Sequence, residues 1–469
     1  MTITADHTTF PSTALAELRR TFDGPLLEPG VDEYDLARNI WNGSGDRRPA
    51  LIARCTGVED VRAAVRFARA HDVLTSVRGG GHSIPGHSVC EGGLMIDLSL
   101  MKGVRVDAGR AVARAQPGVK WGEFDRETAR ADLATPGGYV SSTGIAGLTL
   151  GGGIGWLSRL HGLTCDNLLA ADVVNADGEF VRASAEENAE LFWGLRGGGG
   201  NFGIVTSFEY RLHPLSAVLG GALVYDGRRT EEILAQFAEF ALAAPDELTM
   251  LGLLITGPRV NSYPEHMRGM PVVFIGVCYA GDPVTGAALL DGFRAQTRPD
   301  LDFVREMSYA KLQRMLDNDA TWGVPWYEKA TYAQEITPAA IATFSEHWTH
   351  RVSERDQMYM QQMGGQISRV PEDATPFGNR GTQFVYMIMS GWKRGQDPAP
   401  HVQWARSGWA AMQPYGSGQG VYVNFDSEDD PTRVRATYGP KYERLGRLKG
   451  QYDPTNLFRL NQNIEPIPN

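Results

Sequence analysis

Glycine is concentrated in four clusters near the start of this chain, and these clusters restrict its fold more than any other feature. They lie at Gly79–Gly81, Gly137–Gly138, Gly144–Gly155 and Gly197–Gly203. Glycine permits positive φ angles and close approach of a backbone to a ligand, and successive free N–H groups in such turns bind anions. One cluster alone could be a tight turn. Four together predict a large ligand held by backbone, with an anionic group such as a pyrophosphate.

A Rossmann dinucleotide site is the first hypothesis to test against these clusters. Gly198, Gly200 and Gly203 have the required spacing, but that motif must follow a strand and open a helix. Here it leads into the β-branched run 204–206, which predicts a strand. We therefore expect no Rossmann site, and the absence of GxxxxGK[ST] excludes a P-loop.

Helices and strands are expected to alternate around the glycine clusters. Apolar periodicity over 59–71 predicts a helix. Short β-branched runs at 73–77, 94–98 and 204–210 predict strands. The segment 171–178 contains a strand followed by Ala-Asp-Gly, which is typical of a hairpin.

Past Pro214 the sequence changes character. Long β-rich runs such as 271–279 and 382–390 are separated by helical stretches such as 337–351. This pattern predicts an antiparallel sheet backed by helices, and hence an α+β fold.

The length of 469 residues exceeds the roughly 250–300 residues at which a single core stops growing. We divide the chain into a ligand-holding module at 1–215, a second module at 216–414, and a segment at 415–469 that returns to the first module.

Composition excludes several classes of function. The net charge of −10, with no long run of Lys and Arg residues, argues against a nucleic-acid partner. No apolar stretch approaches the 18 or so residues of a membrane span, and the first residues do not resemble a secretory signal. The four cysteines are widely spaced without a CxxC pair, which predicts neither a disulfide framework nor a metal site. We expect a cytoplasmic protein, monomeric or homodimeric.

Several motifs, in a fixed order, resemble one known family. They are Val77–Ser83, Gly86–Cys90, Ile96–Ser99, Pro136–Gly138, Gly144–Leu157, Gly162–Asn167, Phe192–Thr206, Tyr422–Asn424 and Tyr452–Pro466. The combination resembles the berberine-bridge-enzyme-like FAD-linked oxidases of the vanillyl-alcohol-oxidase superfamily. The resemblance spans nearly the whole chain, with few fixed motifs in the middle third. It implies a PCMH-type FAD-binding domain of two subdomains at 1–215 and a substrate-binding domain at 216–414.

The resemblance also implies how the cofactor is held. His82 would be joined to the C8α methyl of the flavin, a reaction suited to imidazole, which is a good nitrogen nucleophile near neutral pH. The other residues expected to contact FAD are Arg78, Gly79, Gly80, Gly81, Ser83, His87, Ser88, Gly137, Gly138, Thr143, Gly144, Gly147, Gly153, Gly155, Asn201, Gly203, Ile204, Val205, Asn424 and Asn461.

Two positions depart from the family pattern. Many relatives carry a second covalent link through a cysteine, but Val140 occupies that position and cannot form a thioether. We therefore expect the mono-covalent bacterial type. Family oxidases often have a tyrosine general base where this chain has Phe425, so that role is vacant. Tyr422 is one candidate to replace it.

Other catalytic candidates lie beside the expected flavin. Thr143 occupies the position that lines the oxygen-access side in this family; it resembles a subgroup that forms a flavin-N5-oxide, although a threonine there can also simply pack. The alternating run 358–363 predicts a strand that forms the floor of the substrate pocket, with Tyr359 and Gln362 as hydrogen-bonding groups.

Three functions follow as hypotheses. The first is an FAD-dependent oxidase that removes a hydride from a secondary metabolite, an aromatic or sugar alcohol, or an amine, with O2 as acceptor and H2O2 as product. The second is a flavin-N5-oxide-type oxygenase of a polyketide-like substrate, favoured by Thr143. The third is a non-catalytic flavoprotein that sequesters a ligand, favoured by Phe425.

Overall fold

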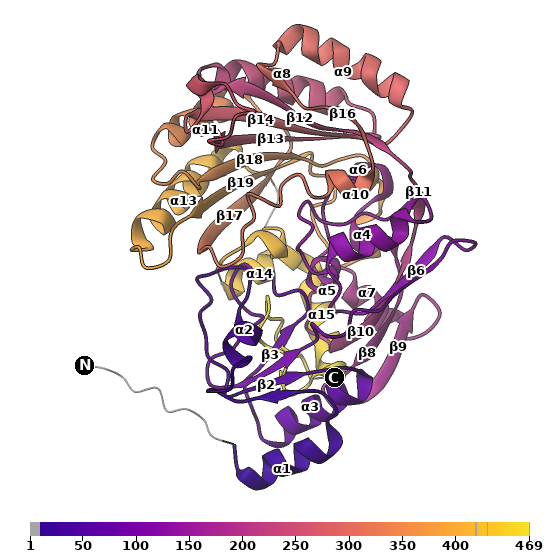
Figure 1. Cartoon of the computed structure of the whole chain (residues 1–469). Coiled ribbons are helices and arrows are strands. Elements are labelled where there is room, and N and C mark those ends of the chain that lie inside the picture. Colours follow the sequence, from indigo (N-terminus) through magenta and orange to yellow (C-terminus); the bar gives the residue numbers. More distant parts are fainter. Residues whose placement is uncertain (1–9, 418–419, 429, 469) are drawn as a thin grey trace.

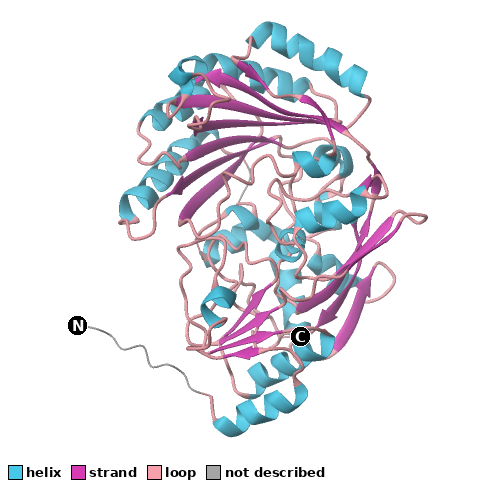
Figure 2. Cartoon of the chain, viewed as in Figure 1, coloured by secondary structure: helices cyan, strands magenta, loops and turns pink. Residues whose placement is uncertain are grey.

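The computed structural model describes residues 10–417, 420–428 and 430–468. Figure 1 shows two bodies: a lower one built from the first half of the chain and its C-terminal segment, and an upper one built from the middle of the sequence. Helices and separate sheets occur in both (Figure 2). The predicted α+β class is confirmed.

A small sheet with the strand order β1-β2-β4-β3 opens the lower body. Strands β2 (Leu51–Arg54), β4 (Leu94–Asp97) and β3 (Thr75–Arg78) are parallel, and β1 (Leu26–Leu27) pairs antiparallel with β2. Helix α3 (Val58–Ala70) connects β2 to β3. Its predicted apolar face is buried in a core shared with the sheet, which fixes where β3 ends and the first glycine cluster begins.

The second sheet is antiparallel, with the order β5-β6-β10-β8-β9. Its strands are β5 (Val104–Asp107), β6 (Val112–Ala115), β10 (Ile204–Arg211), β8 (Leu168–Val174) and β9 (Phe180–Ser184). The predicted hairpin is the β8–β9 pair. Gly203 has φ +146° and enters strand β10 directly, so the glycine spacing opens no helix, as expected.

Short elements connect the two sheets of the lower body and cover the first module. They are helices α1 (Ser12–Thr21), α2 (Tyr34–Arg38), α4 (Trp121–Ala129), α5 (Ile145–Leu150), α6 (Ser158–His161) and α7 (Ala189–Leu195), and the paired strands β7 (Leu133–Ala134) and β11 (His213–Pro214).

The upper body is one antiparallel sheet with the order β15-β12-β14-β13-β18-β19-β17, and β16 also pairs with β12. Its strands are β12 (Val218–Asp226), β13 (Leu248–Thr256), β14 (Pro271–Tyr279), β15 (Leu301–Asp302), β16 (Arg305–Met307), β17 (Trp326–Ala333), β18 (Gln357–Gln362) and β19 (Phe384–Gly391). The predicted strand at 271–279 is β14. The prediction of an antiparallel sheet backed by helices is confirmed.

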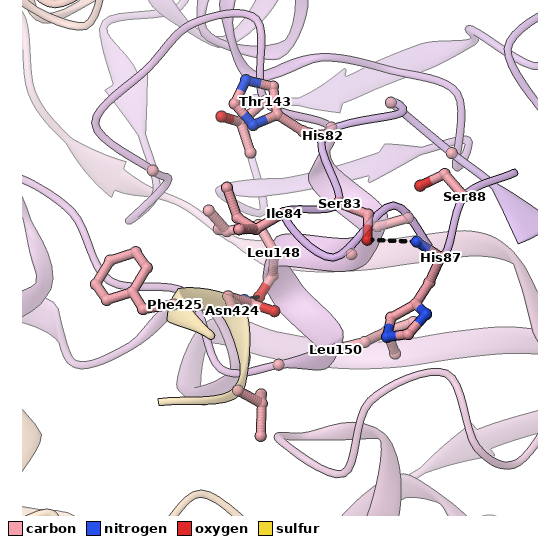
Figure 3. Close-up of a pocket in the computed structure, with 18 of the residues that line it drawn as sticks. His82, Ser83, Ile84, His87, Ser88, Thr143, Leu148, Leu150, Asn424 and Phe425 are labelled. Atoms are coloured by element: carbon pink, nitrogen blue, oxygen red, sulfur yellow. Dashed lines mark hydrogen bonds between the residues drawn. The ribbon is translucent and has the colours of Figure 1, made fainter. Parts of the chain in front are cut away.

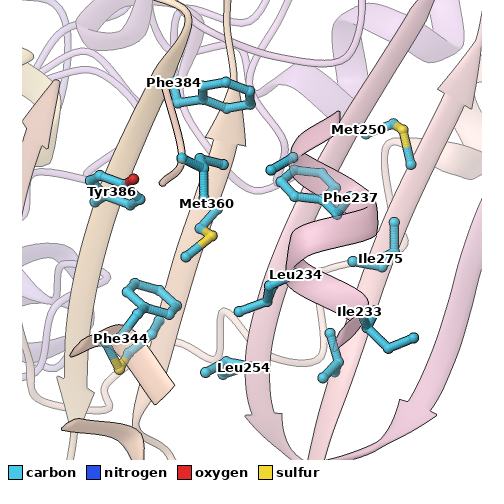
Figure 4. Close-up of a cluster of buried hydrophobic side chains, with 14 of the residues drawn as sticks. Ile233, Leu234, Phe237, Met250, Leu254, Ile275, Phe344, Met360, Phe384 and Tyr386 are labelled. Carbon is cyan, nitrogen blue, oxygen red and sulfur yellow. The ribbon is translucent and has the colours of Figure 1, made fainter. Parts of the chain in front are cut away.

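Helices cover one face of this sheet (Figure 1). They are α8 (Thr230–Ala243), α9 (Pro283–Thr297), α11 (Pro338–Thr349) and α13 (Ala399–Met412). Figure 4 shows Leu234 and Phe237 of α8 packed with strand residues such as Met360 in a continuous apolar core. With this face filled, the opposite face of the sheet is turned toward the lower body, where the small helices α10 (Tyr309–Leu312) and α12 (Gln366–Arg369) also lie.

The C-terminal segment returns to the lower body through α14 (Pro431–Tyr438) and α15 (Tyr442–Tyr452). Tyr438, Tyr442 and Leu445 are buried in the same core cluster as the second sheet. This is the arrangement expected for residues 415–469, while the domain boundaries themselves stay predictions.

No helix within the described ranges is long and apolar enough to cross a membrane. The same residues contain no cluster of His, Cys, Asp and Glu suited to a metal ion. All four cysteines are buried and free.

Candidate active site

A cavity of about 370 Å³ lies where the glycine loops of the lower body face the upper sheet. Its volume is within the range of small-molecule and cofactor sites. One wall comes from loops 79–88, 138–151 and 199–205, and the other from strands β18 and β19. The segment at 422–425 also lines the cavity, with Asn424 next to Leu148, whose carbonyl accepts from the Asn424 amide at 3.3 Å (Figure 3).

Two glycine loops cross beside this cavity with their backbones in contact. A methyl group on Gly80 would lie 2.3 Å from the Cα of Gly144, and one on Gly144 would lie 2.5 Å from the Cα of Gly80. No side chain fits between them. Glycine is therefore required here for the packing of one loop on the other, which brings both backbones to the edge of the cavity.

The first loop presents unpaired backbone donors. Within the described structure, the N–H groups of Gly80, Gly81 and Ser83 donate to no protein acceptor. The Ser83 hydroxyl accepts a hydrogen bond from the N–H of His87 at 3.0 Å, which closes the loop (Figure 3). Such a run of free N–H groups is suited to an anionic ligand.

The imidazole of His82 is held by two neighbours, Trp41 and Ser142. It stacks on Trp41, with ring centroids 4.3 Å apart and planes 17° apart, and its Nε2 lies 3.3 Å from the Ser142 hydroxyl. Burial, with a contribution from the positive charge of Lys120, lowers the pKa of His82 to about 3. The ring is therefore neutral at physiological pH and keeps a nitrogen lone pair available as a nucleophile.

The C-terminal part of the cavity lining carries polar side-chain atoms without partners. Asn461 and Gln462 line it, and the Oδ1 of Asn461 and the Nε2 of Gln462 are buried with no hydrogen-bond partner among the described residues. Buried polar atoms are almost always satisfied. These two are placed to be satisfied by a ligand.

Strand β18 forms part of the floor, as predicted, but with a different set of side chains. Gln357, Tyr359 and Gln361 line the cavity, and the Tyr359 hydroxyl donates to Gln357. Gln362 was expected there and is not. Its amide accepts from Met250 N at 2.8 Å and donates to Ala241 O at 2.5 Å. Because side chains alternate along a strand, Gln362 faces the helices and Gln361 takes the place predicted for it.

Tyr422 lines the cavity but is poorly suited to act as a base. Its hydroxyl accepts hydrogen bonds from Gly153 N at 2.9 Å and Asn424 Nδ2 at 2.8 Å. Burial raises the pKa of Tyr422 well above its ordinary value, so the phenol stays protonated. This geometry argues against the prediction that Tyr422 takes a proton from substrate.

Sequence reasoning missed Glu328, an ionisable residue in the wall of the cavity. Glu328 of β17 lines it with 3% of the residue exposed. Burial, and to a smaller extent the charge of Asp426, raises the pKa of Glu328 to about 8. The signal was present in the sequence: Glu328 and Lys329 are adjacent charges inside a β-rich run, where charged residues are uncommon unless paired or functional.

Known proteins match both walls of the cavity. A family model described as "FAD binding domain" matches residues 49–184, and one described as "Berberine and berberine like" matches residues 421–465. An FAD-linked oxidoreductase from Dictyostelium discoideum is 31% identical over 458 residues, 97% of this chain and 97% of the relative. The chain belongs to the berberine-bridge-enzyme-like FAD-linked oxidoreductases.

Two further relatives are nicotine-derivative oxidases. The (R)-6-hydroxynicotine oxidase of Paenarthrobacter nicotinovorans is 30% identical over 475 residues, covering 95% of this chain and 97% of the relative. The crystal structure of 6-hydroxy-D-nicotine oxidase from Arthrobacter nicotinovorans superposes with a TM-score of 0.83 at 27% identity, over 95% of this chain and 98% of that one. The expected family, the enzymatic character and the FAD-binding fold are confirmed.

The cavity of this oxidoreductase fits FAD. The free N–H groups around Gly80 suit a pyrophosphate, while the unpaired amides of Asn461 and Gln462 can bond polar ring atoms. Of the residues expected to hold the cofactor or act in catalysis, the following line the cavity: Gly79, Gly80, Gly81, His82, Ser83, His87, Ser88, Gly138, Thr143, Gly144, Gly147, Gly203, Ile204, Val205, Tyr359, Tyr422, Asn424 and Asn461.

Five predicted cofactor residues lie behind the lining instead: Arg78, Gly137, Gly153, Gly155 and Asn201. The guanidinium of Arg78 donates to the carbonyl of Ala37. A methyl group on Gly155 would lie 1.9 Å from the carbonyl oxygen of Gly137, so these two glycines pack loops on each other. The Asn201 amide donates to Gly198 O and Gln462 O and accepts from Ile464 N, which fastens the last glycine cluster to the C-terminal segment.

Proposed function

We propose that this oxidoreductase is an oxidase that holds FAD through one covalent bond from His82, oxidises a small, partly apolar molecule and uses O2 as the electron acceptor. The observation that carries the proposal is the neutral His82 imidazole in a cavity whose lining also bears the unpaired amide atoms Asn461 Oδ1 and Gln462 Nε2. The nicotine-derivative oxidases among its relatives support the oxidase class.

The attachment is single. Val140, which lines the cavity, supplies no thiol, and none of the four cysteines belongs to the lining. All four thiols are buried elsewhere, so His82 is the one side chain of the predicted pair that can bond to the cofactor.

Bound FAD supplies the acceptance of two electrons from the substrate and their transfer to dioxygen. The chain contributes orientation and exclusion of water. Met387 and Met389 of β19, Leu251 of β13 and Phe425 give the substrate side an apolar wall, which favours a flat, partly apolar substrate. The Tyr359–Gln357 pair adds polar groups on the floor.

Two measurements test this function. Acid-precipitated protein should stay yellow, and the peptide that contains His82 should carry the mass of FAD; His82→Ala should release all flavin on denaturation. Alcohols and amines should then be screened for anaerobic bleaching of the flavin and for peroxide formed in step with product. A chain that purifies without flavin would remove the basis of the proposal. Tight ligand binding without bleaching would favour sequestration.

Thr143 supports an oxygenase as the second candidate. Thr143 is half-buried in the lining, next to the crossing of the glycine loops, and its hydroxyl makes no hydrogen bond within the described structure. A hydroxyl in this position can contact a polar oxygen species. Incorporation of ¹⁸O from labelled O2 into the product would establish the oxygenase, whereas stoichiometric peroxide would establish the oxidase.

A further inference from the structure

Glu328 is a buried carboxyl group without a partner for one of its oxygens. Its side chain lies in the substrate wall of the cavity, and Oε1 makes no hydrogen bond among the described residues. Leaving a buried polar atom unpaired is costly. An unpaired carboxyl oxygen directed into a ligand cavity is therefore a site for a hydrogen-bond donor on the ligand.

Among the described residues, the cavity lining contains carboxyl groups but no Lys or Arg side chain. Two carboxyl groups belong to its lining: Glu328 on the wall and Asp319, which is exposed to solvent. The described lining therefore contains no Lys or Arg side chain that would repel a cationic ligand.

Two basic side chains behind the wall that carries Glu328 are already engaged. Lys329, the next residue on β17, pairs with Glu428, and its Nζ lies 3.6 Å from Asp426. Arg433 lies 3.2 Å from the same Asp426. These two basic side chains neutralise the carboxylates behind the wall, and Glu328 receives no ion pair within the described structure.

We propose that the substrate is a small aliphatic amine that carries an aromatic ring, and that Glu328 holds its ammonium group and accepts one of its N–H protons. This inference rests on the proposed oxidase function and specifies the substrate of the same site. The apolar wall contacts the ring of the amine, and the carboxyl group selects the cationic nitrogen over a neutral hydroxyl. Glu328 is then the catalytic base that Phe425 cannot be.

The proton transfer involves no change of oxidation state. An N–H bond of the ammonium breaks and its electron pair stays on nitrogen, while an O–H bond forms on Glu328. The products are a neutral amine and a neutral carboxylic acid. The lone pair thus exposed favours the loss of hydride from the adjacent carbon.

Amine binding should depend on pH. The groups near Glu328 are Asp426 from the C-terminal segment and Tyr359 from β18; both are neutral or negative. Burial, with the charge of Asp426, raises the pKa of Glu328 to about 8. Below that pH the carboxyl group is mostly protonated, and it must release its proton before it can pair with a cation. Affinity should rise about tenfold per pH unit up to about pH 8.

The test uses two probes that cannot be oxidised at the carbon bearing the heteroatom. α,α-Dimethylbenzylamine and 2-phenylpropan-2-ol have the same shape and differ in charge. Isothermal titration calorimetry with the FAD-loaded protein at pH 8 should show that the amine binds more tightly than the alcohol, by about tenfold or more. Calorimetry in buffers of different ionisation enthalpy should detect release of a proton at pH 7.

Glu328→Gln should abolish both the preference for the amine over the alcohol and its pH dependence. Asp319→Asn, the control at the exposed carboxyl, should weaken amine binding by about threefold or less. Equal affinities of the wild type for amine and alcohol, or an amine preference retained by Glu328→Gln, would overturn the inference. If Glu328→Gln fails to fold, the comparison of amine and alcohol binding by the wild type still tests the inference.

Failure here is distinguishable from failure of the proposed function. Protein that is loaded with FAD and oxidises another substrate, yet binds both probes equally, contradicts only the inference about Glu328. Protein that carries no flavin contradicts the proposed function itself.

Discussion

The indole of Trp41 lies against the imidazole of His82, and the backbone N–H of Trp41 donates to the carbonyl of Gly81 at 2.8 Å. One residue therefore fixes both the imidazole ring and the backbone beside it. The indole is fixed in turn by its Nε1, which donates to Ala320 O at 2.8 Å. Trp41 therefore positions the nucleophile.

Replacing Trp41 should slow covalent attachment more than it weakens flavin binding. In Trp41→Leu the imidazole loses its stacking partner, and a misplaced nucleophile reacts slower by about tenfold or more. The measurement is the flavin that remains on acid-precipitated protein as a function of time after FAD is added to apoprotein. Trp41→Phe, which keeps an aromatic ring, is the control. Equal attachment rates in the two variants would show that stacking has no positioning role.

Substitution by alanine should have different effects at Gly144 and at Gly147. Gly144→Ala places it against Gly80 and should destabilise the apoprotein, whereas a methyl group on Gly147 meets nothing within 4 Å. Gly147 lines the cavity, so Gly147→Ala should keep the melting temperature and lower the FAD content. Gly292→Ala in α9, which also meets nothing, should lower neither quantity. Full FAD content in Gly147→Ala would show that this glycine does not contact the cofactor.

Glu328 should make stability depend on pH in a defined direction. Burial raises its pKa from 4.5 to about 8, so between these values the folded protein holds a proton that the unfolded chain has released. This stabilising contribution is complete below pH 4.5 and is lost as pH rises through 8. From pH 5 to pH 9, the melting temperature of Glu328→Gln should therefore rise relative to wild type. Exposed Glu231→Gln is the control. Parallel curves for Glu328→Gln and wild type would contradict the raised pKa.

The neighbours Gln361 and Gln362 should respond differently to truncation. Gln362→Ala leaves the buried N–H of Met250 unpaired and should cost about 1–3 kcal/mol of unfolding free energy. Gln361→Ala removes a group of the cavity lining and should change the affinity for 2-phenylpropan-2-ol with less loss of stability. Denaturant unfolding and calorimetry measure the two effects. The reverse assignment of the effects would mean that strand β18 is rotated relative to the cavity.

These glutamines also mark the limit of prediction from the sequence. The alternating pattern over 358–363 was sufficient to predict a strand in the pocket floor, because side chains on a strand repeat every second residue. It could not decide which of the two faces is turned to the cavity, since that depends on helix α8 packing against Met250 and Met360.

The glycine clusters illustrate the same limit. Their positions were sufficient to predict a backbone-lined ligand site, yet glycines that line the cavity and glycines that pack loops have the same appearance in the sequence. Gly155 is needed because the Gly137 carbonyl lies beside it, a contact that exists only in three dimensions. Glu328 was missed because its isolation from Lys329 and Arg433 arises from pairs formed with the C-terminal segment.

The return of that C-terminal segment has a consequence for biosynthesis. The binding site contains Asn424, Asn461 and Gln462. These residues leave the ribosome after the glycine loops and all strands of the upper sheet. A nascent chain that ends after the glycine loops lacks the C-terminal residues of the binding site. Cofactor loading is therefore a late step of maturation, and a chain that ends before Asn461 should lose two of the unpaired polar atoms of the binding site.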